Sequence, residues 1–371
     1  MSQININTFQ RKSNTIGGFV ISIIIFFNFI VPTAIIPRSV FISVFSIIPF
    51  ILLLNRCLIE KKSIIFIFIL FTITIISGTF QNLINLYFII LFQLLIYKYN
   101  EGLTINKINR LFIAIGCLSI ILQIFYYFIT NNSEIERIGL GTDPNFSGLI
   151  VLLLFFFLRI IRSKLSLIPV IIAIFLFQSR VLLLSILIYF AIQHLSNTTF
   201  NKWLFKIISP FWMILISNIL VFTLSFFLIT HVTFQKKETS SITDRISNIA
   251  DQSNFGRLTS NLFWTEKVLS GKYLLKSENL EKNNFDTTSV ILPHNSLLNL
   301  VISSTTIFGI IYLLYISFLL KPLLNISNLK YFYSFLFYTL FLHGLFNSIY
   351  LFPFLLIFLI KPINQFELNN K

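Results

Sequence analysis

The sequence has 371 residues, of which 56% are hydrophobic, only 11% are charged and 45 are phenylalanine. Globular proteins carry about 25% charged residues, so this composition excludes a pair of soluble domains and indicates a chain that lies mostly in lipid. The net charge is +15. In a membrane protein, an excess of basic residues indicates how the chain is oriented across the bilayer. We therefore expect no nucleic-acid partner.

Long apolar runs predict an all-α, polytopic membrane protein. A bilayer core about 30 Å thick is crossed by about 20 mostly apolar residues in a helix. Barrel strands would alternate, whereas these runs are continuously apolar. The first run follows Arg11 and Lys12, and we expect it to be an uncleaved anchor. About twelve spans are predicted, near 17–36, 39–58, 63–79, 82–98, 108–130, 147–161, 165–179, 180–194, 207–231, 295–320, 331–347 and 348–361.

One sizeable hydrophilic stretch, 232–293, interrupts the apolar sequence. We therefore expect one integrated membrane domain in three consecutive parts. Residues 1–231 would hold spans one to nine, 232–293 a large extracytoplasmic loop, and 294–371 the last three spans with a cytoplasmic tail.

The distribution of charge predicts the orientation. With a cytoplasmic N-terminus, the inner segments hold 17 basic and three acidic residues, whereas the outer segments hold 11 basic and ten acidic ones. Short cytoplasmic loops are enriched in Lys and Arg. We therefore expect both termini inside and the long loop outside, which places the connection 131–146 and Arg180 on the outer face as well.

Arg180 in "FQSRVLLLS" lies between two apolar runs, where a cation at mid-bilayer costs about 2.5–3.5 kcal/mol on insertion scales. It is either an interfacial arginine that reaches the headgroups or a cation that faces a polar cavity and suits phosphate. In "GTDPNFSG", Asp143-Pro144 predicts a turn into a helix, with Asn145 or Ser147 as the cap. Alternatively, Asp143 or Asn145 binds sugar hydroxyls beside Arg137.

His294 begins the tenth predicted span, between Pro293 and Asn295. A histidine at a helix start is often a cap or an interfacial residue. With a pKa near 6.5, it is also a natural candidate to take a proton from a hydroxyl.

Several kinds of chemistry have no motif in this sequence. Phosphate-binding glycine loops, HExxH and paired aspartates are absent, and Cys57 and Cys117 form neither a disulfide framework nor a zinc site. The outer acidic residues are scattered, and mid-membrane acids, which ion-coupled carriers need, are lacking. We expect no metal and no cofactor.

In its architecture and in four local patches, the chain resembles the bacterial O-antigen polymerases and the related O-antigen ligases. The similarity covers the whole chain: about twelve spans, with one large outer loop before the last three. Two segments, Arg137 to Gly148 and Arg245 to Gly256, also match the Arg-x10-Gly spacing of the polymerase loops. The four patches are "RIGLGTDPNFSG" (137–148), "QSRVLLL" (178–184), "GRLTSNLFW" (256–264) and "HNSLLNLVISSTTIFG" (294–309).

The sequence departs from the family in one place. Gly309 follows the His-Asn pair after thirteen residues, whereas the family has nine. Four extra residues are about one helical turn, so we expect Gly309 to stay on the same helix face as it would at the family's spacing.

The resemblance implies a glycosyltransferase of the bacterial inner membrane with its site on the periplasmic face. Its donor would be an undecaprenyl-pyrophosphate-linked oligosaccharide. A polymerase would add it to a second lipid-linked unit; a ligase would add it to the lipid A core. We favour the polymerase. Lipid is an expected partner, and a chain-length regulator is a further candidate.

The resemblance also implies roles for single residues. His294, Arg180 and Arg137 would be catalytic, with His294 deprotonating the acceptor and the arginines holding the pyrophosphate. The expected substrate-binding residues are Arg257, Arg245, Asp143, Asn145 and Asn295.

Two alternatives belong to other functional classes. One is a flippase for lipid-linked sugars, and the other is a structural membrane subunit without enzymatic activity.

Overall fold

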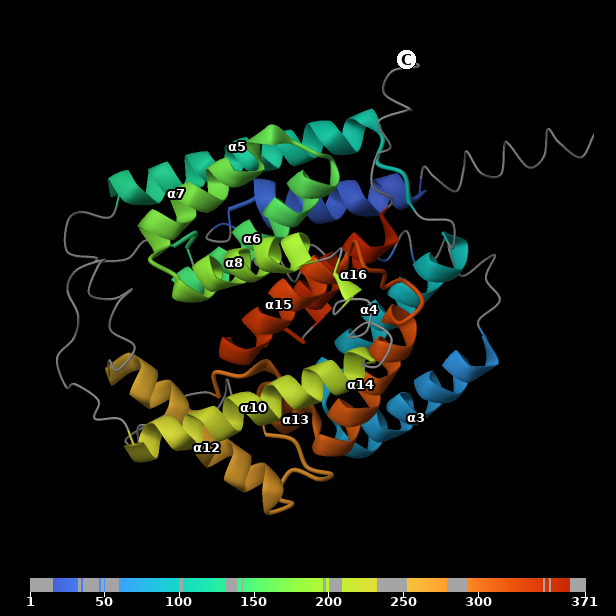
Figure 1. Ribbon diagram of the computed structural model, residues 1–371. Coiled ribbons are helices and arrows are strands. Elements are labelled where there is room, and N and C mark those ends of the chain that lie inside the picture. Colours follow the sequence, from blue (N-terminus) through green and yellow to red (C-terminus); the bar gives the residue numbers. More distant parts are fainter. Residues whose placement is uncertain are drawn as a thin grey trace, which may run out of the picture. The chain divides into compact units, whose positions relative to one another are not determined.

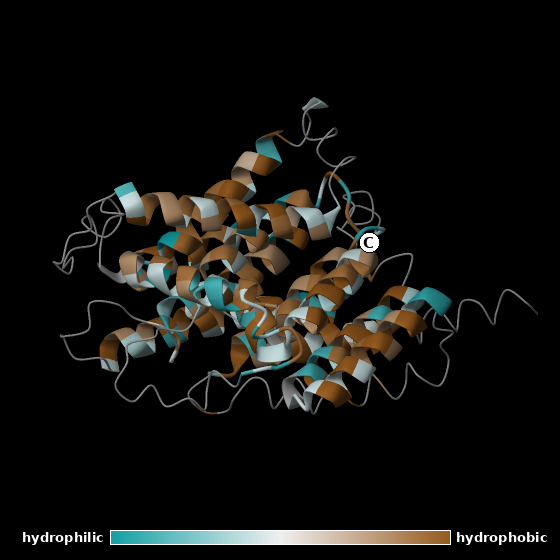
Figure 2. Cartoon of the chain, turned by 90° about the horizontal axis from the view of Figure 1, so that it is seen from below, coloured by the Kyte–Doolittle hydropathy of each residue, from teal (hydrophilic) through white to brown (hydrophobic). Residues whose placement is uncertain are grey.

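The computed structural model describes the chain in eleven stretches and three single residues, and confirms the all-α class for them. Every named element in this part of the chain is a helix (Figure 1), and hydrophobic residues predominate along most of these helices (Figure 2). The one β-type contact there is an isolated parallel bridge between Leu103 and Ile360. The described residues are 16–32, 35, 47, 50, 60–99, 103–130, 139–141, 143–195, 198–199, 209–231, 252–278, 293–342, 344–346 and 348–360.

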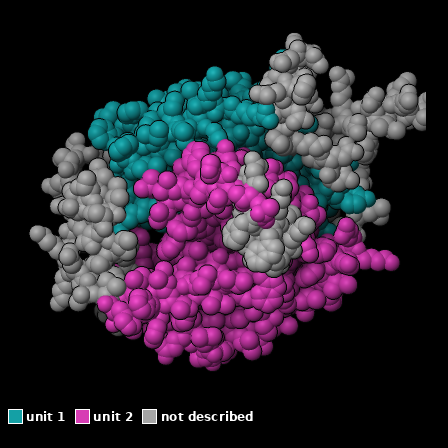
Figure 3. Space-filling model, in the orientation of Figure 1, with its two compact units in different colours: residues 1–59, 91–182, 352–371 teal, residues 60–90, 183–351 magenta. Residues whose placement is uncertain are grey.

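The chain forms two compact units, each built from separate stretches of sequence (Figure 3). Unit 1 comprises residues 1–59, 91–182 and 352–371, and unit 2 comprises 60–90 and 183–351. Three helices contain a boundary between the units: α4 (Phe80–Lys98), α8 (Arg180–Leu195) and α16 (Ser348–Leu359).

Unit 1 is built around α6, in which 14 of 17 residues are buried. A helix that is hydrophobic on all sides is typical of a core position. Asn109 of α5 ties the first helix to the unit, because its Nδ2 donates to Gly18 O and Ser22 Oγ, both at 2.8 Å. The elements of unit 1 are the helix Ile16–Ile30 with its π-helical end η1 (Phe26–Ile30), α5 (Lys107–Thr130), α6 (Pro144–Ile160), η2 (Lys164–Leu167) and α7 (Ile168–Phe177).

In unit 2, α3 packs against α14. The Phe66 ring stacks on Tyr315 with centroids 5.1 Å apart. Beyond the C-terminal end of α3, Asn82 Nδ2 of α4 donates to the O atom of Ser304, two residues before α14, at 3.1 Å. The two helices therefore run antiparallel. The elements that lie wholly in unit 2 are α3 (Lys61–Ser77), α10 (Pro210–His231), α12 (Gln252–Leu269), α13 (Ser296–Ser304), α14 (Thr306–Leu320) and α15 (Leu329–Phe341).

Most described helices coincide with predicted apolar runs. Two of them, Lys107–Thr130 and Pro210–His231, are long and apolar enough to cross a membrane. Bulky apolar side chains stay exposed on both, such as Ile129 at 72% and Leu220 at 63%. The predicted run 39–58 lies almost entirely outside the described residues.

The prediction of one continuous span over 295–320 is wrong, because the helix ends at Ser304 and a new one begins at Thr306. Thr305 lies between them with φ 101° and ψ 151°, a region that residues with a Cβ rarely adopt. Its side chain caps α14 by accepting from Phe308 N at 3.2 Å. A residue outside these two helices also stabilises the break, since Thr306 N donates to Tyr273 O at 2.8 Å.

The break also overturns the expectation that one extra turn keeps Gly309 on the helix face that follows His294. Gly309 belongs to the second helix, α14. A Cβ there would lie 3.2 Å from Val301 Cγ2 and 3.5 Å from Val301 Cα. Gly309 therefore allows α13 and α14 to pack closely, which is a structural reason for a small residue at this position.

Candidate functional site

The stretch around Asp143 forms the predicted turn into a helix. Pro144 is the first residue of α6, and Asp143 is its N-cap, with Asn145 N donating to Asp143 Oδ1 at 2.8 Å. The expectation that Asn145 or Ser147 provides the cap is therefore wrong. Ser147 instead closes the turn, because its Oγ accepts from Leu140 N at 2.8 Å and donates to Asp143 O at 3.2 Å.

The second patch forms the turn between α7 and α8. Gln178 ends α7 in the left-handed conformation with φ 50°. Ser179 then precedes α8, and its Oγ accepts from Leu182 N at 3.4 Å, the geometry of an N-cap. Arg180 is the first residue of α8 and is half-buried.

A side-chain hydrogen bond joins these two patches. Ser179 Oγ donates to Asn145 Oδ1 at 3.1 Å, and both side chains are buried. The N-termini of α6 and α8 are thus held together, 34 residues apart in sequence. Helix N-termini carry a partial positive charge, which favours anions. With Arg180 at the same place, this corner of unit 1 suits a phosphate group; we call it the α6–α8 corner.

The fourth patch lies in unit 2, where His294 is half-buried immediately before α13. Asn295 is the N-cap, with its Oδ1 accepting from Leu297 N at 2.9 Å and Leu298 N at 3.1 Å. Its Nδ2 donates to Asn218 Oδ1 at 2.6 Å and to Leu340 O at 3.4 Å. The Asn295 amide is therefore engaged within the protein and fixes the backbone that carries His294.

Arg257 lies on α12, half-buried. This helix packs against both α10 and α13, so Arg257 is carried by the same group of helices as His294. On the buried face of α12, Trp264 packs with Tyr273 and Ile302. The third patch, 256–264, therefore forms part of the support for the helix that follows His294.

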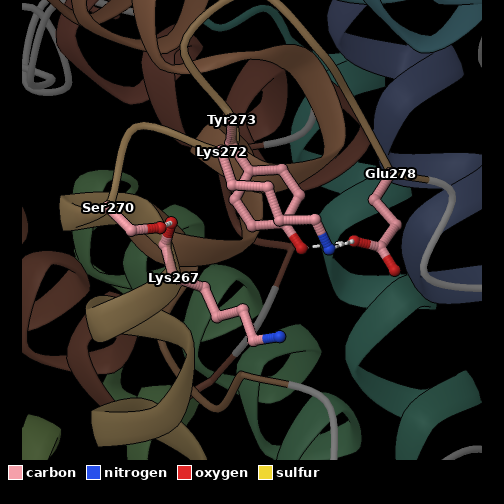
Figure 4. A network of polar contacts seen from close by, with 5 residues as sticks. All are labelled: Lys267, Ser270, Lys272, Tyr273 and Glu278. Atoms are coloured by element: carbon pink, nitrogen blue, oxygen red, sulfur yellow. Dashed lines mark hydrogen bonds and ion pairs between the residues drawn. The ribbon is translucent and has the colours of Figure 1, made fainter.

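Two features of unit 2 were not anticipated from the sequence. Asn218 of α10 bonds Asn295, although it lies inside an apolar run. After α12, Tyr273 donates a hydrogen bond to Glu278, and Lys272 Nζ lies 3.6 Å from Glu278 Oε2 (Figure 4). Burial, and then the bond to Glu278 and its charge, raise the pKa of the Tyr273 phenol, so it stays a donor at neutral pH.

Four predicted residues need separate mention. Arg137 and Arg245 lie outside the described residues. Arg180 and His294 belong to different units, so their expected cooperation in one site stays a prediction. Among the residues that the structure describes, no three His, Cys, Asp or Glu side chains gather to hold a metal ion.

Comparison of the chain with protein-family models, with curated proteins and with solved structures gives no match.

Proposed function

We propose that the chain is a surface-polysaccharide polymerase: a multi-pass enzyme of the bacterial inner membrane that joins undecaprenyl-pyrophosphate-linked oligosaccharides on the periplasmic face. The observation that carries this proposal is the α6–α8 corner. Two helix N-termini and Arg180 meet there through the bond between Ser179 and Asn145, which is an arrangement suited to a pyrophosphate leaving group.

The proposed membrane location has its own support. About twelve spans are proposed from the apolar runs, with both termini cytoplasmic. On α10, four of the 22 residues are buried: Pro210, Met213, Ile214 and Ser225. The core helix of a soluble protein would be mostly buried, whereas a helix that faces lipid keeps apolar side chains exposed.

The proposed chemistry needs no nucleotide, because the energy is stored in the bond between sugar and pyrophosphate. Arg180, with Arg137, would bind the pyrophosphate and offset the negative charge that develops as it leaves. His294 would take the proton of the acceptor hydroxyl as its oxygen attacks the anomeric carbon. Asn295 would position His294 through its four hydrogen bonds, and Arg257 would bind the glycan or the second pyrophosphate.

Arg180→Ala and His294→Ala test the site. Each should lower chain elongation about 10²–10³-fold, the usual effect of removing one preorganised catalytic group, while the protein accumulates normally. Arg180→Lys should recover part of the activity, because it keeps the charge and loses the two-pronged geometry. Lys164→Ala, an exposed basic residue of η2, is the matched control. Full-length polymer from both alanine variants would refute the site.

The surface lipid of a deletion strain distinguishes polymerase from ligase. Loss of a polymerase should leave single repeat units attached to that lipid, since ligation continues without elongation. Long chains that accumulate on the carrier lipid, with no attached sugar, would identify a ligase. Loss of all repeat units from the periplasmic face would identify a flippase.

A further inference from the structure

Three leucines and two lysines project from the turn that follows α12. Leu269 is 77% exposed, Leu274 50% and Leu275 52%, and Lys272 and Lys276 are exposed as well. We call residues 269–276 the leucine turn. Exposed leucines scattered singly are ordinary, but three within seven residues form a local apolar patch with basic side chains between them.

The outward position of these leucines is fixed by their neighbours. Gly271 turns the chain at φ 78°, and its N–H donates to Val268 O at 3.1 Å. Tyr273 takes the inward position, 2% exposed, against Trp264 and Ile302. Its hydroxyl is held by Glu278, which Lys272 also approaches (Figure 4). With Tyr273 inward, the flanking residues must point away from the unit.

The leucine turn lies at the N-terminal end of α14. Tyr273 O accepts from Thr306 N at 2.8 Å, and Leu274 O accepts from Ile307 N at 3.5 Å. Along α14, Ile310 and Leu314 are exposed at 43% and 38%, at a spacing that places them on one face. The apolar surface of the turn thus adjoins an apolar face of α14.

We propose that the leucine turn inserts into the outer leaflet of the membrane. Leu269, Leu274 and Leu275 would lie among the first methylenes of the acyl chains, and Lys272 and Lys276 would meet anionic lipid phosphates. This inference rests on the proposed membrane location, in which α14 begins at the outer leaflet. Exposed leucines with lysines between them fit the boundary between apolar acyl chains and anionic headgroups. The exposed apolar face of α14 would extend this lipid-facing surface into the bilayer.

The insertion would have a consequence for the substrate. The turn ends α12, and α12 carries Arg257. A lipid-anchored α12 would hold Arg257 at the level of the headgroups, where the pyrophosphate of a lipid-linked glycan also lies.

Depth-dependent fluorescence quenching on the full chain tests the proposal. In a Cys57→Ser, Cys117→Ser background, Leu275→Cys carries an environment-sensitive fluorophore in vesicles of phosphatidylcholine and phosphatidylglycerol. Doxyl quenchers are placed either near the headgroup or deep in the acyl chains. Glu266→Cys, exposed on α12 one turn earlier, is the matched control, and Leu220→Cys on α10 reports the membrane core.

The expected result is a blue-shifted label at Leu275 that shallow doxyl quenches more strongly than deep doxyl, while the label at Glu266 shows no blue shift and is quenched less by shallow doxyl than the label at Leu275. Combining Lys272→Gln and Lys276→Gln should reduce quenching in these vesicles and have no effect without phosphatidylglycerol. An unquenched Leu275 beside a quenched Leu220 would overturn this inference alone, and a blue shift without quenching would assign the turn to a protein surface. An unquenched Leu220 would overturn the proposed membrane location and the insertion with it.

Discussion

The Ser179 hydroxyl performs two tasks at one atom. It accepts from Leu182 N at the start of α8 and donates to Asn145 Oδ1 at the start of α6. Because the group is buried, water cannot replace either partner. The position of Arg180, one residue further on, therefore depends on a neutral hydrogen bond between two uncharged side chains.

Ser179→Ala should destabilise the protein by about 1–3 kcal/mol, because it leaves Asn145 Oδ1 without this donor and removes a helix cap. The measurement is thermal unfolding in detergent. Ser163→Ala is the matched control, since Ser163 caps η2 with a bond to Leu165 N but has no buried partner. The cost of Ser179→Ala should exceed that of Ser163→Ala.

Combining Ser179→Ala with Asn145→Ala measures the coupling directly. If the two residues act through their shared bond, the double variant should lose less stability than the two single losses added together. Strict additivity would show that the bond does not join the helices energetically.

Single residues were partly predictable from sequence. The dipeptide Asp143-Pro144 predicts a turn and the start of a helix without any tertiary information, and α6 begins there. The identity of the cap was missed, because Asp143, Asn145 and Ser147 are all competent caps and only the path of the preceding chain chooses among them. The meeting of Asn145 with Ser179 is a tertiary event and has no local signal.

At the scale of elements, the break between α13 and α14 is the main departure from expectation. The sequence "ISSTTIFG" is apolar enough to continue a span, so hydropathy gives no reason to stop. Hydroxyl side chains compete for backbone groups and favour caps, which was the available signal. The contact of Thr306 with Tyr273, from a distant loop, lies beyond any local pattern.

Thr305→Ala and Thr305→Gly should have different effects on the stability of the protein. Alanine keeps the unfavourable φ and loses the cap, so it should lower stability by about 1 kcal/mol. Glycine adopts this φ without strain and costs only a few tenths as a cap, so it should equal or exceed wild type. Unfolding temperatures measured side by side decide the matter; an alanine variant more stable than the glycine variant would mean that the backbone is unstrained.

At the scale of the whole molecule, the asymmetry of charge is the strongest guide to orientation. Most helix positions followed from hydropathy, because long apolar runs favour helices that are kept from water, either in a protein core or in the proposed membrane. The division into two units did not follow, since residues 60–90 associate with 183–351 through contacts that sequence order conceals.

Labelling of intact cells tests the orientation. In the cysteine-free background, a membrane-impermeant maleimide should label Glu266→Cys from outside, because residue 266 belongs to the proposed outer loop. It should label Lys164→Cys only after the membrane is permeabilised, since positive charge is retained on the cytoplasmic side. Both positions are exposed in the structure. The reverse pattern would invert the topology and place the candidate site in the cytoplasm.

The break at Thr305 also shortens the proposed span that follows it. At a rise of 1.5 Å per residue, the 15 residues of α14 extend over about 22 Å, whereas a hydrocarbon core is about 30 Å thick. A bilayer next to a short helix becomes thinner to match it. Around α14 the outer headgroups would therefore sink toward the midplane, and a prenyl-linked pyrophosphate diffusing past would be lowered into the protein without leaving its leaflet.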